Sequence, residues 1–216
     1  MINTNKIINK IQEIRSKNNV NWMDLLRIAI KKDPKNSRKV ISNIYQSDSD
    51  ISDLVFILNQ SSKINKIISL NKVGKDDCDI ILNWRNDPIS RLYSRNKNII
   101  LKKDHIKWFN LKLNSKNDIT LIAKISHLRL GTVRYDKIKE KLFEVSININ
   151  PNFRKIGLSK QILKLSEKEI KAKDVLIKAF VLKENLASIK LFKSCKYKIH
   201  KIAKSGLVEF RKKLTN

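Results

Sequence analysis

The sequence has few cysteines and no long apolar run. Its 216 residues include two cysteines, Cys78 and Cys195, which are too few for a disulfide framework. This scarcity favours a reducing compartment, and Cys195 is predicted to be a small core residue. No stretch stays apolar for long enough to predict a signal peptide or a membrane-spanning helix. Together these absences predict a soluble cytoplasmic protein with no membrane partner.

Acidic residues are also scarce relative to basic ones. The chain has 20 Asp and Glu against 47 Lys and Arg, which gives a net charge of +27. Such a charge suggests nucleic-acid binding, but the lysines are spread along the whole chain, and no aromatic and basic strand pair or recognition helix stands out. We expect no nucleic-acid partner, although a basic RNA- or DNA-binding protein remains an alternative. The same field would steer anionic small molecules toward the protein.

Residues 1–62 are predicted to form a small all-α domain, separate from an α/β domain at 63–216. Apolar residues recur at helical spacing in this segment, so a bundle of three or four short helices is expected. Pro34 would separate the second helix from the third, and caps are expected at Asn36 and Ser49 or their next neighbours. We interpret the bundle as a docking or dimerisation module, for a homodimer or for contact with a pathway enzyme.

In the second domain, apolar periodicity and turn residues predict a strand, two helices, three strands, a helix, a strand, a helix and a closing hairpin. The strands are expected at 67–73, 119–125, 129–135, 143–150, 175–181, 198–203 and 207–213. The helices are expected from 77 to before Pro88, at 103–113, from the loop at 152–160 to about residue 172, and from Asn185 to Cys195. No internal repeat is visible.

The most informative stretch begins with the strand at 143–150. Apolar and polar residues alternate strictly there, so one face of the strand is polar. That face carries Glu144, Ser146, Asn148 and Asn150. A row of polar groups inside a sheet is costly without partners. We therefore expect the row to line a reaction cleft, and a simply solvated face is the alternative.

A basic loop that contains a glycine follows the strand and opens a helix. A helix start offers unpaired N–H groups and the positive end of the dipole, which together form an anion site. Gly157 would let an anion approach the backbone because it has no Cβ, and Ser159 keeps the next turn small. Three residues add positive charge: Arg154, Lys155 and Lys160. The loop is therefore predicted to bind a pyrophosphate, with an ordinary strand-to-helix turn as the alternative.

The arrangement Arg154-x-x-Gly157-x-Ser159 resembles the acetyl-CoA loop of the GNAT acetyltransferase superfamily, with Ser159 where the family has Gly or Ala. The segment from Glu184 to Phe192 resembles the family's later helix, whose Asn lies near the pantetheine arm. The resemblance covers roughly residue 67 to the end of the chain. It implies a GNAT fold with a mixed, largely antiparallel sheet flanked by helices, in which the strand at 143–150 splays from its neighbour. It assigns acetyl-CoA binding to Ile149, Arg154, Lys155, Ile156, Gly157, Leu158, Ser159, Lys160 and Asn185.

Glu144 is predicted to be the catalytic base. An acceptor amine is protonated at neutral pH, and a carboxylate in a partly dry cleft can remove its proton directly or through a water. A backbone N–H near Ile149 would stabilise the oxyanion. Many family members have a Tyr as general acid where this chain has Phe192, so that role is vacant. Ser188 and Tyr197 are candidate substitutes, each with a structural role as the alternative.

A further resemblance concerns the acceptor. The segment from Asn83 to Asp87, with the later His105 and Trp108, resembles the GNAT branch that acetylates nucleotide-linked amino sugars in bacterial surface-glycan pathways of the pseudaminic acid type. It implies an acceptor pocket formed by Trp84, Arg85, Asn86, Arg91, His105 and Trp108. Within it, Arg85 and Arg91 would hold a nucleotide diphosphate. Helix-surface charge for the arginines and packing for His105 are the alternatives, and His105 is also a second candidate base.

The predicted function is acetyl-CoA-dependent N-acetylation of a nucleotide-linked amino sugar, in surface polysaccharide or nonulosonate biosynthesis. Acetylation of protein N-termini or lysines, as by ribosomal-protein acetyltransferases, is the alternative within the same superfamily. A non-catalytic acyl-CoA-binding protein is another alternative, because the usual tyrosine is absent. No metal site is expected.

Overall fold

The computed structural model describes residues 22–59 and 64–215. The chain divides into two units between Leu58 and Asn59, and each unit is described by itself. In the described part of the chain, no helix is both long enough and apolar enough to cross a membrane. The predictions that fall on residues 1–21 and 60–63 lie outside the described residues.

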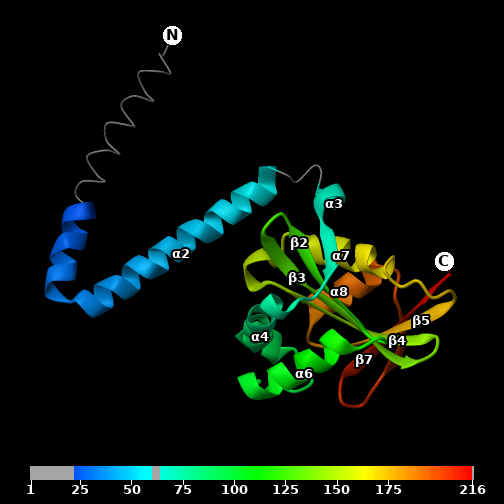
Figure 1. Ribbon diagram of the computed structural model, residues 1–216. Coiled ribbons are helices and arrows are strands. Elements are labelled where there is room, and N and C mark those ends of the chain that lie inside the picture. Colours follow the sequence, from blue (N-terminus) through cyan, green and yellow to red (C-terminus); the bar gives the residue numbers. More distant parts are fainter. Residues whose placement is uncertain (1–21, 60–63, 216) are drawn as a thin grey trace, which may run out of the picture. The chain divides into compact units, whose positions relative to one another are not determined.

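Two helices are described in the N-terminal unit, residues 22–32 and α2 (Pro34–Asn59) (Figure 1). Pro34 separates them as predicted, but the cap is Asp33, whose Oδ1 accepts the Asn36 N–H at 3.1 Å. The predicted break near Ser49 is wrong. The hydroxyls of Ser47 and Ser52 each donate to the carbonyl four residues back, at 3.0 Å, and such bonds satisfy serine within a helix.

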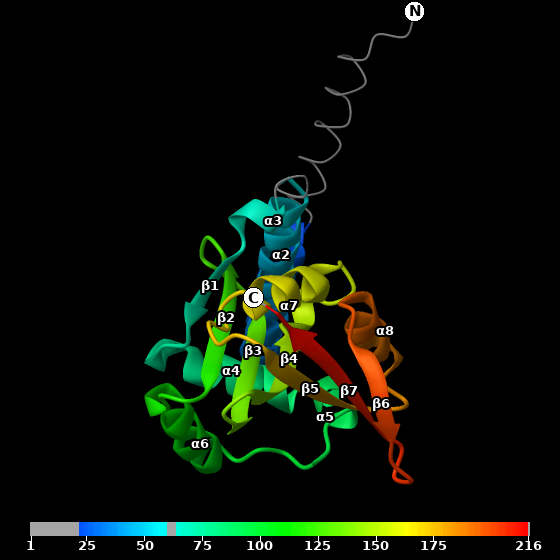
Figure 2. The same cartoon turned by 90° about the vertical axis from the view of Figure 1, so that its right-hand side faces the viewer.

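The second unit contains one seven-stranded sheet in the order β1-β2-β3-β4-β5-β7-β6 (Figure 2). The strands are β1 (Ser69–Lys72), β2 (Ile119–Ile125), β3 (Leu128–Lys139), β4 (Leu142–Ile149), β5 (Val175–Leu182), β6 (Lys198–Ile202) and β7 (Leu207–Leu214). All neighbours pair antiparallel except β4 and β5, which are parallel. The predicted mixed, largely antiparallel sheet is confirmed.

Helices cover both faces of this sheet. They are α3 (Ile64–Ile67), α4 (Cys78–Asn86), α5 (Pro88–Leu92), α6 (Lys102–Asn114), α7 (Leu158–Glu167) and α8 (Leu186–Ser194), with short 3₁₀ turns η2 (Lys75–Asp77) and η3 (Pro151–Phe153). Figure 1 shows α7 and α8 on one side of the sheet and α4 and α6 on the other.

Strand β1 is shorter than the predicted 67–73 and β3 is longer than the predicted 129–135, and two helices also differ from the predictions. Pro88 follows the end of α4 as expected, but it is also the first residue of α5, where its missing N–H is not needed. Asp87 caps this short helix by accepting the Ser90 N–H at 2.9 Å. Helix α7 ends at Glu167 instead of near residue 172, and Ile170, beyond its end, is buried in the core.

A separate apolar core lies on each side of the sheet. Beneath α4 and α6 the core consists of Val73, Ile81, Trp84, Phe109 and Ile122. On the other side, Phe192 of α8 stacks on Phe210 of β7 with ring centroids 5.7 Å apart. Cys195, which closes α8, is buried as predicted. The two cores hold β4 in the middle of the sheet, where its polar face is directed toward α4 and α6.

Candidate active site

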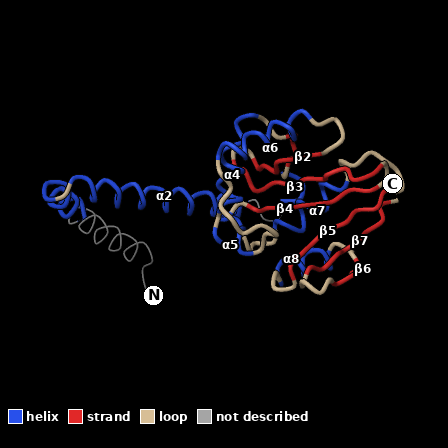
Figure 3. The backbone as a smooth tube through the Cα atoms, turned by 90° about the horizontal axis from the view of Figure 1, so that it is seen from below, coloured by secondary structure: helices blue, strands red, loops and turns tan. Residues whose placement is uncertain are grey.

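Strands β4 and β5 separate soon after they begin. Their pairing runs from Leu142↔Leu176 to Glu144↔Lys178 and stops there, although β4 continues to Ile149 and β5 to Leu182. Figure 3 shows the two strands diverging. The expected splay is therefore present, and Glu144 lies where the opening between the strands begins.

The backbone of β4 supplies N–H groups to this opening. The Asn150 N–H donates to the Leu130 carbonyl of β3 at 2.9 Å. Because successive N–H groups of a strand point to opposite sides, the Ile149 N–H points away from β3 and toward the side where β5 has diverged. A ligand extended along the opening can therefore bond to β4 as an added strand would.

The phosphate loop, residues 152–160, has the backbone that an anion site requires. Gly157 is the N-cap of α7 and adopts φ +88°, and a Cβ built there would meet no atom within 4 Å. Lys155 is also left-handed, with φ +64°. Left-handed residues of this kind turn neighbouring N–H groups toward one concave side. The first turn of α7 thus leaves open space and unpaired donors at the predicted pyrophosphate position.

Arg154 does not direct its side chain to that space. Its Nη1 lies 2.7 Å from Oδ2 of Asp87, and its Nη2 donates to Oγ of Ser90 at 2.8 Å. Burial alone would raise the pKa of Asp87, but the bonds from the Ser90 N–H and from Arg154 lower it. Arg154 therefore ties the phosphate loop to α5, and the predicted positive charge at the loop comes from the exposed Lys155 and Lys160.

The other predicted cofactor residues fall into two groups. Ile156 is exposed beside Lys155, whereas Leu158 is buried and anchors the first turn of α7, with Ser159 half-buried next to it. Asn185 lies on a separate element, where it caps α8 and its Oδ1 accepts the Ser188 N–H at 3.1 Å.

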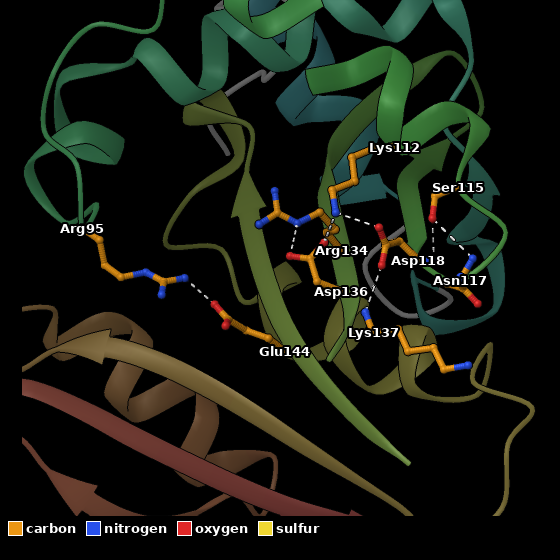
Figure 4. A network of polar contacts seen from close by, with 9 residues as sticks. All are labelled: Arg95, Lys112, Ser115, Asn117, Asp118, Arg134, Asp136, Lys137 and Glu144. Carbon is orange, nitrogen blue, oxygen red and sulfur yellow. Dashed lines mark hydrogen bonds and ion pairs between the residues drawn. The ribbon is translucent and has the colours of Figure 1, made fainter. Parts of the chain in front are cut away.

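Glu144 is half-buried, and its partner was not predicted. Arg95, from the segment between α5 and α6, donates a hydrogen bond through Nη2 to Oε1 of Glu144. The Glu144 side chain is 18% exposed and that of Arg95 is 59% exposed. Figure 4 shows the two side chains pointing toward each other. The predicted base is thus a carboxylate held by a solvent-exposed guanidinium.

A narrow cavity lies between the β4 polar face and helices α4 and α6. It is lined by Ile81, Arg85, Trp108, Thr120, Thr132, Arg134, Ser146 and Asn148. Its volume of about 20 Å³ has room for one water molecule. Thr120 is buried, and its Oγ1 has no hydrogen-bond partner among the described residues. We call these eight residues the acceptor pocket, because they include two of the predicted acceptor residues.

Two arginines flank the indole of Trp108 in the acceptor pocket. The Cζ atoms of Arg85 and Arg134 lie 5.8 Å and 5.2 Å from the ring centroid, within the range of a cation–π contact. Burial lowers the pKa of Arg85, and the nearby charge of Arg134 lowers it further. Arg134 was not predicted from the sequence. The pocket thus presents two cations on an aromatic ring, an environment that favours anions.

Beside the pocket, Arg134 belongs to an ion-pair network that fixes its position (Figure 4). Its Nε donates to Oδ2 of Asp136 at 2.8 Å, and Lys112 of α6 contacts both Asp136 and Asp118 at 2.7 Å. Burial would lower the pKa of Lys112, but the bonds to these two carboxylates raise it. The network holds α6 on β3 and leaves Arg134 facing the pocket.

Three other predicted acceptor residues have structural contacts. Trp84 is buried in the core beneath α4. The Asn86 amide bonds to both the N–H and the carbonyl of Ile100 at 2.9 Å. Arg91 donates to the carbonyls of Asn86 and Lys97 at 3.2 Å and 3.3 Å. Asn86 and Arg91 therefore hold the segment 93–101, and none of the three lines the acceptor pocket.

His105 is a packing residue in this structure. It is only 2% exposed, and its Nε2 lies 2.9 Å from the Cys78 carbonyl oxygen, which requires a proton on that nitrogen. Its ring lies 5.3 Å from Trp108 and 5.9 Å from Phe109. Burial lowers its pKa, so the neutral form is favoured. Such a ring orients Trp108 but does not face the cavity.

Of the two candidate general acids, Ser188 is half-buried in the first turn of α8, where its N–H donates to Asn185, whereas Tyr197 is enclosed in the core. Phe192, at the position where the family often has Tyr, packs against Phe210 and Tyr197 in the core. Tyr197 is 3% exposed, and its hydroxyl has no hydrogen-bond partner among the described residues. Burial raises the pKa of Tyr197 far above its ordinary value. A buried phenol on the α8 side of the sheet cannot reach a leaving group in the opening.

The comparison with protein families identifies the family of this chain. Residues 81–197, just over half of the chain, match the model described as the acetyltransferase (GNAT) family. The chain belongs to the GNAT acetyltransferase family. The match includes β4, the phosphate loop, α7, β5 and α8, so the elements that form the opening are those of the family.

Individual relatives agree with this family. Acetyltransferase PseH of Campylobacter jejuni is 22% identical over 138 residues, which cover 62% of this chain and 85% of PseH. Spermidine N-acetyltransferase from Vibrio cholerae, solved with CoA and spermine, has a TM-score of 0.60 and 14% identity over 69% of this chain and 96% of that one. The acetyltransferase YncA of Salmonella typhimurium, solved with acetyl-CoA, has a TM-score of 0.56 and 17% identity over 68% and 94%.

This GNAT chain is therefore an acyltransferase that uses acetyl-CoA, and its residues fit that cofactor. The open space at Gly157 would admit the pyrophosphate, and the unpaired N–H groups at the start of α7 would bond to it. The β4 backbone beyond Glu144 would hold the pantetheine arm. When bound, acetyl-CoA supplies an acetyl group as a thioester that an amine can attack.

Proposed function

We propose that this GNAT enzyme acetylates the amine of a nucleotide-linked amino sugar. The observation that carries the proposal is the acceptor pocket, in which Arg85 and Arg134 flank Trp108 within the range of cation–π contacts. Two cations beside an aromatic ring favour an acceptor that carries negative charge. The similarity to acetyltransferase PseH supports an amino sugar of the pseudaminic acid type and a role in surface-glycan biosynthesis.

In the proposed reaction Glu144 removes one proton from the acceptor ammonium, directly or through a water. The neutral nitrogen then forms a bond to the thioester carbonyl carbon, and the carbon–sulfur bond breaks. The nitrogen gives up its second proton to the departing thiolate or to solvent water, so that the product is a neutral amide. The Ile149 N–H donates to the carbonyl oxygen as negative charge develops on it. No protein acid is required, because a thiol with a pKa of about 8.5 leaves as thiolate near neutrality.

The proposal is tested by measuring release of the CoA thiol with a panel of acceptors. The panel contains amino-sugar nucleotides, the corresponding free amino sugars, and peptides with a free N-terminus or a lysine. We expect turnover of an amino-sugar nucleotide, with a higher kcat/KM than for the same sugar without its nucleotide. Turnover of peptides alone would instead indicate a protein acetyltransferase.

We also propose that the N-terminal unit is a docking or dimerisation module. Four apolar residues of α2 are exposed at intervals that place them on one face: Val40, Ile44, Ile51 and Val55. A chain that begins at Lys63 should still fold and bind CoA, because the phosphate loop and the opening lie beyond it. Sedimentation of the two forms measures any change in oligomeric state, and loss of folding in the shorter chain would contradict the boundary.

A further inference from the structure

The ion pair between Arg95 and Glu144 spans the opening between β4 and β5. Arg95 contacts Glu144 at the last paired position of β4, and its Cζ lies 5.5 Å from the ring centroid of Phe180 on β5. Phe180 comes two residues after Lys178, so it belongs to the part of β5 that has left β4. The guanidinium therefore lies across the opening on the side of the acceptor.

Arg95 is placed so that it can exchange its partner. It lies in the segment 93–101, which has no helix or strand. The Ser94 hydroxyl donates to the Ser90 carbonyl at 2.8 Å, and the segment is held again at Lys97 and Ile100, so the backbone is anchored on both sides of Arg95. Its side chain is mostly in solvent, whereas Glu144 is mostly buried. Because the Arg95 side chain is solvent-exposed, its guanidinium can move from Glu144 into water at little cost in its own desolvation. Movement of Arg95 away from Glu144 therefore needs no rearrangement of the sheet.

The neighbouring carboxylates are already neutralised by other cations. Asp136, which pairs with Glu144 across β3 and β4, is held by Lys112 and Arg134. On β5, Lys178 lies 3.5 Å from Glu209. Arg95 is thus the cation that an acceptor ammonium must replace in order to contact Glu144.

We propose that Arg95 is a positioning residue that exchanges between Glu144 and the diphosphate of the acceptor. The acceptor ammonium takes the place of the guanidinium at Glu144, and the released guanidinium binds the phosphate oxygens of the same molecule. An acceptor that carries an ammonium and a diphosphate pairs with both Glu144 and Arg95, whereas a simple amine leaves Arg95 without a partner. The inference rests on the proposed function, because it assumes that the acceptor has an amine and a diphosphate.

The test is binding of uridine diphosphate to the full-length protein with CoA at saturation, measured by calorimetry at about 0.15 M salt. CoA fills the phosphate loop, so the probe reports on the acceptor side. Arg95→Ala should weaken binding by about tenfold or more, because a charge-assisted bond to phosphate is lost. Glu144→Gln should strengthen binding, because Arg95 is no longer held. Arg95→Lys should fall between Arg95→Ala and the wild type.

Lys102→Ala is the matched control, because Lys102, like Arg95, is an exposed cation that pairs with a carboxylate, in this case Asp79 of α4. It should leave binding unchanged. Inorganic pyrophosphate, used in parallel, should show the same order of variants if the phosphates alone are recognised. Equal affinity in the wild type and Arg95→Ala, no gain in Glu144→Gln, or no binding in either protein would overturn the exchange. Because no turnover is measured, this result is independent of whether an amino-sugar nucleotide is acetylated.

Discussion

The phosphate loop and the acceptor pocket are built from different parts of the chain. The phosphate loop depends on backbone, namely a left-handed Gly157 and the free N–H groups at the start of α7. The acceptor pocket depends on side chains that come from α4, α6 and three strands. Backbone sites need particular residues at fixed spacing, whereas side-chain pockets use the same residue types that also pack and anchor. The first kind can therefore be recognised in a sequence much more readily than the second.

The largest expected effect comes from Glu144, the carboxylate between the phosphate loop and the acceptor pocket. Glu144→Gln keeps the shape of the side chain but removes the proposed base, so kcat should fall by about 10² to 10⁴. CoA affinity should hardly change, because the phosphate loop is untouched. A higher pH should restore part of the rate, since more of the acceptor amine is then already deprotonated.

Glu209→Gln is the control for this variant, because Glu209 is another half-buried carboxylate of the sheet, bonded to Arg211 at 2.6 Å. It should keep the wild-type kcat. A wild-type rate in Glu144→Gln near neutral pH would place the base elsewhere in the opening.

Of the two tryptophans predicted to contact the acceptor, Trp84 packs in the core and Trp108 lines the acceptor pocket, so their variants should have different effects. Trp84→Ala empties a core position, so it should lower the free energy of unfolding by about 3–5 kcal/mol. Trp108→Ala removes a half-buried ring beside the cavity and should cost less stability while it raises the acceptor KM. Thermal unfolding and steady-state kinetics of both variants provide the measurement. A raised KM in Trp84→Ala at a temperature where it is fully folded would contradict the assignment.

The contrast between a site built from backbone and a pocket built from side chains explains how much of this protein could be predicted from its sequence. Strand β2 was predicted to the residue, because the apolar and β-branched run at 119–125 ends at the turn residues Ser126 and His127. The splay at Glu144 and the turn at Gly157 followed from the motif and its resemblance. Helix α5 is not among the predicted helices, because a proline after a helix predicts its end, whereas proline also begins helices.

Pairings between distant residues could not be predicted in this way. Arg154 was expected at the phosphate, yet it binds Asp87, 67 residues away in the chain. Arg95 and Glu144 are separated by 49 residues, and nothing in the sequence marks Arg95 among so many basic residues. Charge pairs depend on which loops meet in space. A chain with net charge +27 offers too many candidate cations for composition to choose among them.

A smaller effect is expected at the phosphate loop. Gly157→Val places a branched side chain at φ +88° and into the space left for the pyrophosphate, so CoA affinity should fall by about tenfold or more. Gly206→Ala is the control for backbone strain, because Gly206 has φ +80° in the β6–β7 turn. It should bind CoA normally. Unchanged affinity in Gly157→Val, measured by calorimetry, would contradict the cofactor site.

The smallest effect concerns His105 and the pH dependence of stability. Burial lowers the pKa of His105 in the folded protein, whereas the unfolded chain has a pKa of about 6.5. As the pH falls through this value the unfolded state takes up a proton that the folded state does not. The free energy of unfolding should therefore decrease below about pH 7, by at most about 1.4 kcal/mol per pH unit for this one group.

His105→Gln can still donate to the Cys78 carbonyl but has no proton to gain, so it should lose this part of the pH dependence. The measurement is thermal unfolding from pH 5 to pH 8, with His200→Gln, at an exposed position, as the control. At pH 7.5 the kcat of His105→Gln should stay near that of the wild type, because the imidazole packs beneath Trp108 and does not meet the acceptor. A large loss of kcat with unchanged stability would make His105 the base in place of Glu144.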